Sequence, residues 1–185
     1  MLEEKAGLIL NVNVVKKIFQ RKLADIGITY KFKVHEAIWL ASIVEYLISE
    51  IIELAGNYVK DKKRVRIDED AIVSTIKMDK ELFKLFNVDK IKYDCSNYGL
   101  GLRLWIERIM KQVHPECQMK LGTTNYIDTL IETYIKSFIN AFPKDQQNPE
   151  DIDIAQIIGK TLQGKLSEFG VINCQKAVNK YETKI

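Results

Sequence analysis

Apolar residues are densest between positions 36 and 67, where the chain reads EAIWLASIVEYLISEIIELAGNYVKDKKRVRI. Their spacing predicts one long helix of about 25 residues, fraying after Gly56-Asn57 and followed by a compact basic loop at 60–66. The apolar positions surround much of this helix: Ala37, Ile38, Leu40, Ala41, Ile43, Val44, Leu47, Ile48, Ile51, Ile52, Leu54 and Ala55. A surface helix has one apolar stripe, so this pattern indicates burial on several sides. At about 1.5 Å rise per residue, such a helix needs a partner helix that crosses it.

A second long helix is predicted over 123–142, where apolar pairs recur every four residues and therefore wind around the helix. Shorter helices flank both long ones. In the first half, they are expected after a cap at Asn11 or Asn13, at 68–78 after a cap at Asp68, and at 79–86. In the second half, they are expected at 102–113 before His114-Pro115, at 151–162 and at 166–181. The last of these helices should have its apolar residues inward: Leu166, Phe169, Val171, Ala177, Val178 and Tyr181. The chain thus repeats a short–long–short helical unit, with all-α halves at 1–86 and 98–185 joined by a linker at 87–97.

Composition adds that the chain is an ordinary globular protein. It has 185 residues, 46% of them hydrophobic and 29% charged, which is typical of one folded domain or two small ones. The net charge is +3, so any affinity for nucleic acid must come from local clusters of basic residues. The long helix carries Glu45, Glu50 and Glu53, so we do not expect it to span a membrane.

Cysteine usage and the N-terminal sequence favour a reducing compartment. Cys95, Cys117 and Cys174 are odd in number and widely spaced, which is typical of thiols rather than of a disulfide framework. No secretory signal is visible in MLEEKAGL, so a secreted protein is not expected.

The sequence contains no motif that indicates an enzyme, a cofactor or a metal site. No Cys/His spacing is typical of zinc, and no Ser, His and Asp residues group as a catalytic triad. The glycines form no phosphate-binding loop. For His114 we expect a structural, hydrogen-bonded role.

Two long motifs carry a resemblance to a known family. AGL at 6–8 and WLASIVEYLISEIIELAGNYVKDKKRVRI at 39–67 closely resemble core histone two-A. MKQVHPE at 110–116 and LQGKLSEFGVINCQKAVNKYETK at 162–184 resemble core histone two-B. The resemblance extends over nearly the whole chain apart from the linker. It implies two tandem histone folds that form an intramolecular handshake heterodimer with an extra C-terminal helix. Fused pairs of this kind resemble the histone doublets encoded by large DNA viruses.

The resemblance also implies that DNA is bound through its backbone, with an arginine entering the minor groove where it faces the protein. Arg66 stands at the position of the family's loop arginine. The other residues implied in DNA binding are Lys63 and Arg64 beside it, Lys31 before the long helix, Lys16, Lys17 and Arg21 on the first helix, and Arg103, Arg108, Lys111 and Lys120 in the second half. The simpler alternative is that these charge clusters are only solvated surface.

An acidic site for other chromatin proteins is implied at Glu45, Glu50, Glu53, Asp79 and Glu81, where charge-assisted bonds to arginines are expected. Solvation of the helix's only polar strip explains these acids equally well.

Several positions depart from the family. Lys80 replaces an acid, Lys165 and Asn173 occupy positions that would complete the patch, Val14 replaces a DNA-contacting arginine, and the loop at 143–151 lacks the family's lysine–arginine–serine sequence. These departures imply weaker binding to DNA.

As a function, the resemblance implies a structural protein that packages double-stranded DNA together with partner histones resembling histones three and four. The protein would then occur with DNA in a host nucleus or viral factory and in the virion. The near-neutral charge predicts a particle that salt disrupts easily. The alternative is a histone-fold regulator, or a histone mimic that serves as a scaffold for protein interactions.

Overall fold

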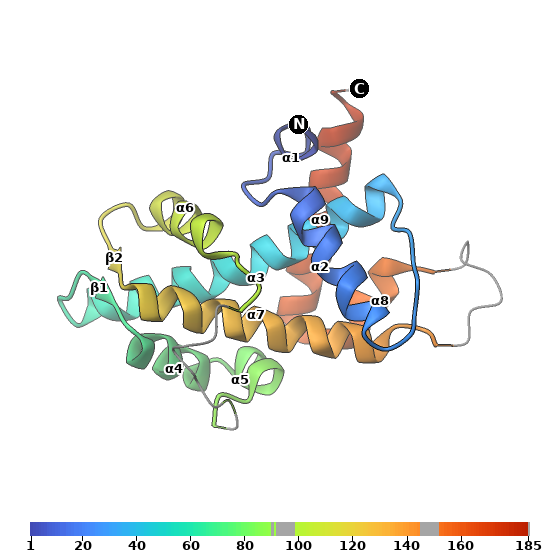
Figure 1. The fold of residues 1–185 in the computed structure, drawn as a ribbon. Coiled ribbons are helices and arrows are strands. Elements are labelled where there is room, and N and C mark those ends of the chain that lie inside the picture. Colours follow the sequence, from blue (N-terminus) through green and yellow to red (C-terminus); the bar gives the residue numbers. More distant parts are fainter. Residues whose placement is uncertain (90, 92–98, 145–151, 185) are drawn as a thin grey trace. The chain divides into compact units, whose positions relative to one another are not determined.

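The structure is a computed structural model that describes residues 1–89, 91, 99–144 and 152–184. These residues form nine helices and two short strands (Figure 1): α1 Leu2–Ala6, α2 Val12–Ala24, α3 Val34–Asp61, β1 Arg66–Ile67, α4 Glu69–Met78, α5 Lys80–Phe86, α6 Arg103–Val113, β2 Gln118–Met119, α7 Leu121–Ala141, α8 Ile154–Thr161 and α9 Gly164–Glu182. The protein is therefore mostly helical, as the sequence predicts. Among the described residues, no helix combines the length and apolarity that crossing a membrane requires.

The chain divides into two compact units, and each contains residues from both sequence halves. Unit 1 comprises residues 1–45 and 134–185, and unit 2 comprises residues 46–133. Both boundaries fall inside the long helices α3 and α7, so the two units do not coincide with the sequence halves 1–86 and 98–185.

The core of unit 1 is built around five aromatic rings. The ring of Phe19 on α2 packs edge-on against that of Phe138 on α7, with 5.0 Å between centroids. Tyr30 and Phe32, from the segment before α3, lie 5.3 Å and 6.3 Å from Phe142. Such edge-to-face pairs are favourable beyond their buried area. Residues from the two sequence halves therefore share this core.

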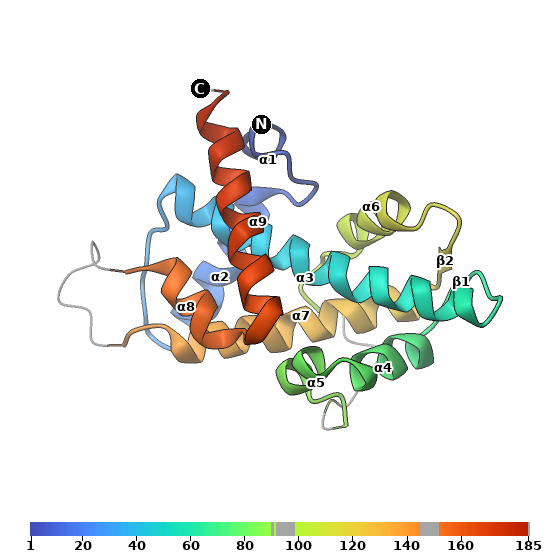
Figure 2. The same ribbon diagram turned by 180° about the vertical axis from the view of Figure 1, so that it is seen from behind.

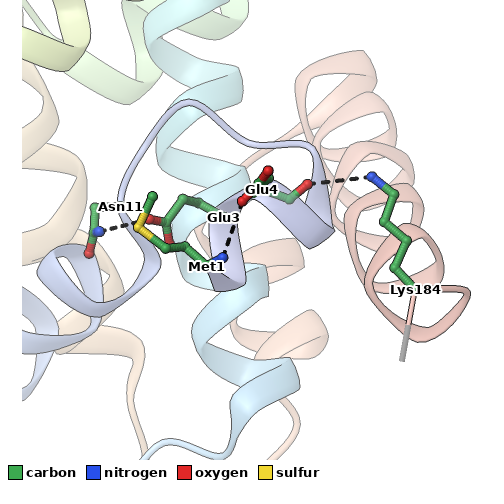
Figure 3. Close-up of polar contacts among 5 residues, drawn as sticks. All are labelled: Met1, Glu3, Glu4, Asn11 and Lys184. Atoms are coloured by element: carbon green, nitrogen blue, oxygen red, sulfur yellow. Dashed lines mark hydrogen bonds and ion pairs between the residues drawn. The ribbon is translucent and has the colours of Figure 1, made fainter.

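The two chain ends meet within unit 1. Helix α1 lies beside α9 in both ribbon views (Figures 1 and 2). Figure 3 shows the polar contacts of this region: the Lys184 ammonium donates to the Glu4 carbonyl at 3.5 Å, and the Asn11 amide donates to Glu3 Oε1 at 2.9 Å. The Asn11 side chain also accepts the Val14 N–H at 3.0 Å, which identifies Asn11, one of the two predicted candidates, as the cap of α2. Helix α8 packs against α9 as well.

In unit 2, the two short strands pair in parallel and bring two distant loops together. Arg66 is in register with Gln118, and Ile67 with Met119. Helix α4 begins at the predicted cap, where the Asp68 carboxylate accepts the Ala71 N–H at 3.0 Å. Helix α5 packs against α4.

The long helices are buried as the sequence predicts. All the apolar α3 residues on which the prediction rests are buried except Leu54. The eight paired positions of α7 are also buried: Tyr126, Ile127, Leu130, Ile131, Tyr134, Ile135, Phe138 and Ile139.

Two local predictions were wrong, and one helix was not predicted. Helix α3 does not fray at Gly56 but continues to Asp61, and the His114 ring packs closely against Gly56. Phe169 is not inward but half exposed, whereas Cys174 is fully buried on the inner face of α9. Helix α1, which precedes Asn11, was not predicted from the sequence. Most of the predicted linker (90 and 92–97) and the altered second-half loop from 145 to 151 lie outside the described residues.

Candidate nucleic-acid interface and acidic cluster

The basic loop after α3 is held in one conformation by backbone hydrogen bonds. The Arg64 N–H donates to the Val59 carbonyl at 2.8 Å, and the Lys63 N–H donates to the Lys60 carbonyl at 2.7 Å. This pair of bonds is a Schellman motif, which requires a left-handed residue at the helix end. Lys63 occupies that position with φ 56°, although it carries a side chain. The loop therefore displays basic residues at the cost of some backbone strain.

The loop's side chains differ in their partners. Arg64 forms an ion pair with Asp68, and the Lys62 ammonium lies 4.4 Å from the centre of the Tyr58 ring, a cation–π contact. Arg66 is exposed on β1 and makes no ion pair with any described residue. The Arg66 side chain thus remains available for an external anion.

Strand pairing places the Arg66 segment beside a segment of the second sequence half. The Gln118 N–H donates to the Val65 carbonyl at 2.8 Å, and exposed Lys120 follows β2 directly. Lys60, which the sequence alone did not single out, lies near the same turn and forms an ion pair with Glu116. Two basic loops that are far apart in sequence therefore form one end of unit 2.

Helix α6 carries the remaining basic candidates of unit 2. Arg103, Arg108 and Lys111 are exposed, at spacings that put them on one broad side of the helix. Arg103 is partly neutralised because its Nε donates to the Glu107 carboxylate at 2.9 Å.

The other basic candidates belong to unit 1. Lys17 and Arg21 are exposed on α2, and Lys16 is half-buried there. Exposed Lys31 lies on the segment after α2, and the Gln20 amide fixes this segment by donating to the Tyr30 carbonyl at 3.1 Å. The structure thus brings the α2 lysines and the Lys31 segment together.

Four of the five acidic candidates gather around Tyr46 in unit 2. Burial raises the pKa of the Glu50 carboxyl, and the nearby charges of Glu53, Asp79 and Glu81 raise it further. The same four carboxylates, after burial, raise the pKa of the Tyr46 hydroxyl. We call Glu50, Glu53, Asp79 and Glu81 the acidic cluster. Their mutual repulsion favours a cationic group at this part of the surface.

Two acidic candidates have structural roles. Glu45 lies in unit 1, where its Oε2 accepts the N–H groups of Ile9 and Leu10, both at 2.7 Å. Its carboxylate therefore anchors the segment before α2 rather than joining the acidic cluster. Asp79 caps α5 by accepting the N–H groups of Glu81 and Leu82 at 2.9 Å and 2.8 Å.

One group of side chains was missed by sequence reasoning. His114, Glu116 and Cys117 each direct a potential metal-ligand atom into one small region. Zinc-finger motifs are found by paired Cys and His residues at set spacings, and a single His-x-Glu-Cys segment does not have them. As expected, His114 is buried and hydrogen-bonded, its Nε2 lying 3.0 Å from the Glu53 carbonyl oxygen.

Comparison with known proteins indicates a class for part of the chain. A region of this chain is similar to histones of the two-A type, and together with the helical structure this supports a histone-fold region. Over 83 residues (44% of this chain), it is 36% identical to a macro-type two-A histone of Capsaspora owczarzaki, of which 21% is covered. Over 48 residues (26% of this chain), it is 48% identical to a two-A histone of Tetrahymena thermophila, of which 36% is covered.

The aligned regions cover only a part of this chain and a part of each relative. A 50-residue stretch is 42% identical to a two-A histone of Triticum aestivum and covers 33% of that protein. The chain therefore spans about a fifth to a third of the length of these curated relatives. No family model matches the chain. No solved structure matches it either.

Proposed function

We propose that this chain is a DNA-packaging histone in which a two-A-like half and a two-B-like half are fused into one intramolecular heterodimer. It binds double-stranded DNA through phosphate contacts and assembles with partner histones resembling histones three and four. The observation that carries this proposal is the paired-loop end of unit 2, where β1 and β2 set the Arg66 loop beside Lys120. The similarity to histone two-A supports it from the sequence side.

The interleaving of the sequence halves supports a handshake arrangement. Phe19 from the first half packs on Phe138 from the second in unit 1. His114 from the second half bonds to the Glu53 carbonyl of the first in unit 2. Each half therefore contributes to both cores, as expected of two histone folds that clasp one another rather than of two separate domains.

The strained loop supports a role in binding. A lysine in the left-handed region costs roughly 1–2 kcal/mol relative to glycine, and such strain concentrates at functional sites. Lys63 holds this conformation at the one turn where Arg64 and Arg66 also project. The mechanism is electrostatic: the basic side chains neutralise phosphates, counterions are released, and many contacts offset the cost of bending DNA.

The experiment that tests DNA binding compares charge reversals on full-length protein. Arg66→Glu with Lys31→Glu should weaken binding to linear duplex DNA and lower the salt dependence, by a slope of about 0.9 for each phosphate that the protein no longer neutralises. A matched control is Lys160→Glu with Lys176→Glu, which changes the same total charge at exposed positions of α8 and α9. If both double variants bind DNA equally well, the packaging proposal fails.

A second experiment addresses the assembly. The chain reconstituted with histones three and four on long DNA should protect that DNA from nuclease, and the protection should disappear at lower salt than for ordinary nucleosomes. The net charge of +3 is the reason for this expectation. Survival to the same salt concentration would contradict it. The viral origin, and residence in a nucleus, viral factory or virion, belong to the same proposal.

The second candidate function is a protein-interaction scaffold, and the acidic cluster favours it. Glu50, Glu53, Asp79 and Glu81 concentrate negative charge at unit 2, beside a pocket of about 260 Å³ lined by Leu54, Asn57, Tyr58, Asp61, Thr75, Met78 and Asp79. An arginine-bearing peptide fits such a surface. Unchanged DNA binding by the Arg66/Lys31 variant, combined with loss of arginine-peptide binding in Glu50→Gln with Glu53→Gln, would favour the scaffold.

A further inference from the structure

The turn after α6 brings three different ligand-type side chains together. One imidazole nitrogen of His114, one carboxylate oxygen of Glu116 and the thiol sulfur of Cys117 all lie within 4.8 Å of one another. His114 and Cys117 are 5% and 4% exposed, whereas Glu116 is exposed to solvent. The turn is closed by the Cys117 N–H, which donates to the His114 carbonyl at 3.0 Å. Two of the three ligand atoms are therefore held in a protected position, and the third provides access.

The hydrogen bonding of His114 points independently to a cation at this turn. Its Nε2 lies 3.0 Å from the Glu53 carbonyl oxygen, and a carbonyl only accepts, so Nε2 carries a hydrogen. In neutral imidazole, Nδ1 then has a lone pair and no hydrogen. Nδ1 nevertheless lies 3.2 Å from the Glu116 carboxylate, which is also an acceptor. Two facing lone pairs need either a proton or a metal ion between them.

The ring of His114 is also locked in place, as a metal ligand requires. Gly56 lies so close that an added Cβ would be 2.0 Å from His114 Cδ2. The bond from Nε2–H to a backbone carbonyl is the arrangement that orients metal-binding histidines and fixes their tautomer. The side of the ring that faces Glu116 is thus the side that carries the ligand nitrogen.

We propose that His114 Nδ1, the Glu116 carboxylate and Cys117 Sγ bind one divalent transition-metal ion, with zinc the best match. A nitrogen, an oxygen and a sulfur ligand suit zinc and disfavour magnesium or calcium, which select oxygen. Zinc bonds of about 2.0–2.3 Å hold ligand atoms closer together than 4.8 Å, so binding draws these side chains inward. Three protein ligands leave a fourth position for water or another donor.

Binding would rearrange the neighbouring ion pair. The Lys60 ammonium pairs with the same Glu116 oxygen that faces His114, so a metal ion competes with Lys60 for that carboxylate. The ion would also close the turn that leads into β2, which pairs with β1. Metal binding therefore stabilises this end of unit 2 and releases Lys60, whether or not the protein binds DNA.

The test uses the full-length chain, reduced and freed of metal with a chelator, titrated with cobalt(II) and then zinc(II). We expect one cobalt ion per chain, with visible d–d absorption and a sulfur-to-cobalt charge-transfer band that zinc abolishes. Zinc should also raise the unfolding temperature, since it binds only the folded turn. Absence of both the absorption and the thermal shift overturns the proposal and leaves a His114–Glu116 proton-mediated pair.

Variants separate this site from other thiols. Cys117→Ser should abolish the charge-transfer band, and Glu116→Gln should keep the band but weaken cobalt binding at least tenfold. Cys174→Ser is the matched control, because Cys174 is also buried but belongs to α9 in unit 1. A band that persists in Cys117→Ser or disappears in Cys174→Ser overturns the assignment. Circular dichroism of each variant establishes that it is folded before titration.

Discussion

At the scale of single residues, Gly56 and Gly159 are two helical glycines that differ in the space available for an added Cβ. A Cβ at Gly56 would lie 2.0 Å from His114 Cδ2, whereas at Gly159 its nearest neighbour is Ser167 Oγ at 4.0 Å. Gly56→Ala should therefore destabilise the protein by roughly 1–3 kcal/mol through overpacking. Gly159→Ala should stabilise it by up to about 1 kcal/mol through helix propensity. Urea unfolding of both variants measures the difference, and equal signs would contradict the packing of His114.

A second residue, Asp128, makes the stability depend on pH. Its side chain is 2% exposed, and burial raises the carboxyl pKa to about 6 from 3.8, although the Gly101 N–H donates to its Oδ2 at 2.9 Å. The folded state thus binds the proton more tightly than the unfolded state, so this group's contribution to stability falls as pH rises from about 4 to 6. Asp128 Oδ1 is buried without a hydrogen-bond partner among the described residues.

Asp128→Asn tests this assignment, because an amide keeps one acceptor for Gly101 and carries no charge. The variant should match the wild type near pH 4 and exceed its free energy of unfolding by about 2–3 kcal/mol at pH 7. The measurement is a series of denaturant unfolding curves between pH 4 and pH 7. A difference that stays constant across this range would show that the charge on Asp128 is not the cause.

At the scale of elements, the end of α3 combines strain with charge. Lys63→Gly should relieve the left-handed strain and raise the free energy of unfolding by about 1 kcal/mol, while it weakens DNA binding by removing a basic side chain. Asn87 is the matched control, since it ends α5 with φ 45°. Asn87→Gly should stabilise less, because asparagine tolerates this region, and should leave DNA binding unchanged. Lower stability of Lys63→Gly would contradict this prediction.

Which elements could be predicted from sequence depended on whether their determinants are local. The caps at Asn11 and Asp68 and the apolar spacing of α3 and α7 lie within a few residues of the structure they specify, so these elements were predicted well. Helix α3 was expected to fray after Gly56-Asn57, because glycine disfavours helix interiors. The real role of Gly56 is to make room for His114, a residue 58 positions away, and no local pattern contains that information.

The candidate site shows the same limit. The basic loop was visible as a run of lysines and arginines, but its pairing with the Lys120 segment depends on β1 and β2 meeting. Glu45 looked like Glu50 and Glu53 along the helix, yet its carboxylate is used by Ile9 and Leu10. Spacing along a helix shows which side chains share a face, whereas the groups that those side chains contact are set by the tertiary structure.

At the scale of the whole molecule, the two sequence halves are parts of the same cores. Unit 1 joins α2 and the start of α3 to the end of α7, α8 and α9, and unit 2 joins the rest of α3 to α6 and the start of α7. The apolar surface of each half is therefore covered by the other half. We expect neither half to retain its fold when it is produced alone, because its long helix would expose most of its apolar surface to water.

This interleaving predicts what happens when the covalent connection is cut. A protease site inserted within the sequence-predicted linker 87–97, cleaved after folding, should leave two fragments that co-elute in gel filtration and unfold in one transition. The reason is that contacts such as Phe19 with Phe138 and Val65 with Gln118 join the fragments without the linker. The cleaved complex should lose stability at dilute protein concentration, since association then becomes bimolecular. Fragments that separate and each unfold cooperatively would instead establish two independent domains and rule out the intramolecular handshake.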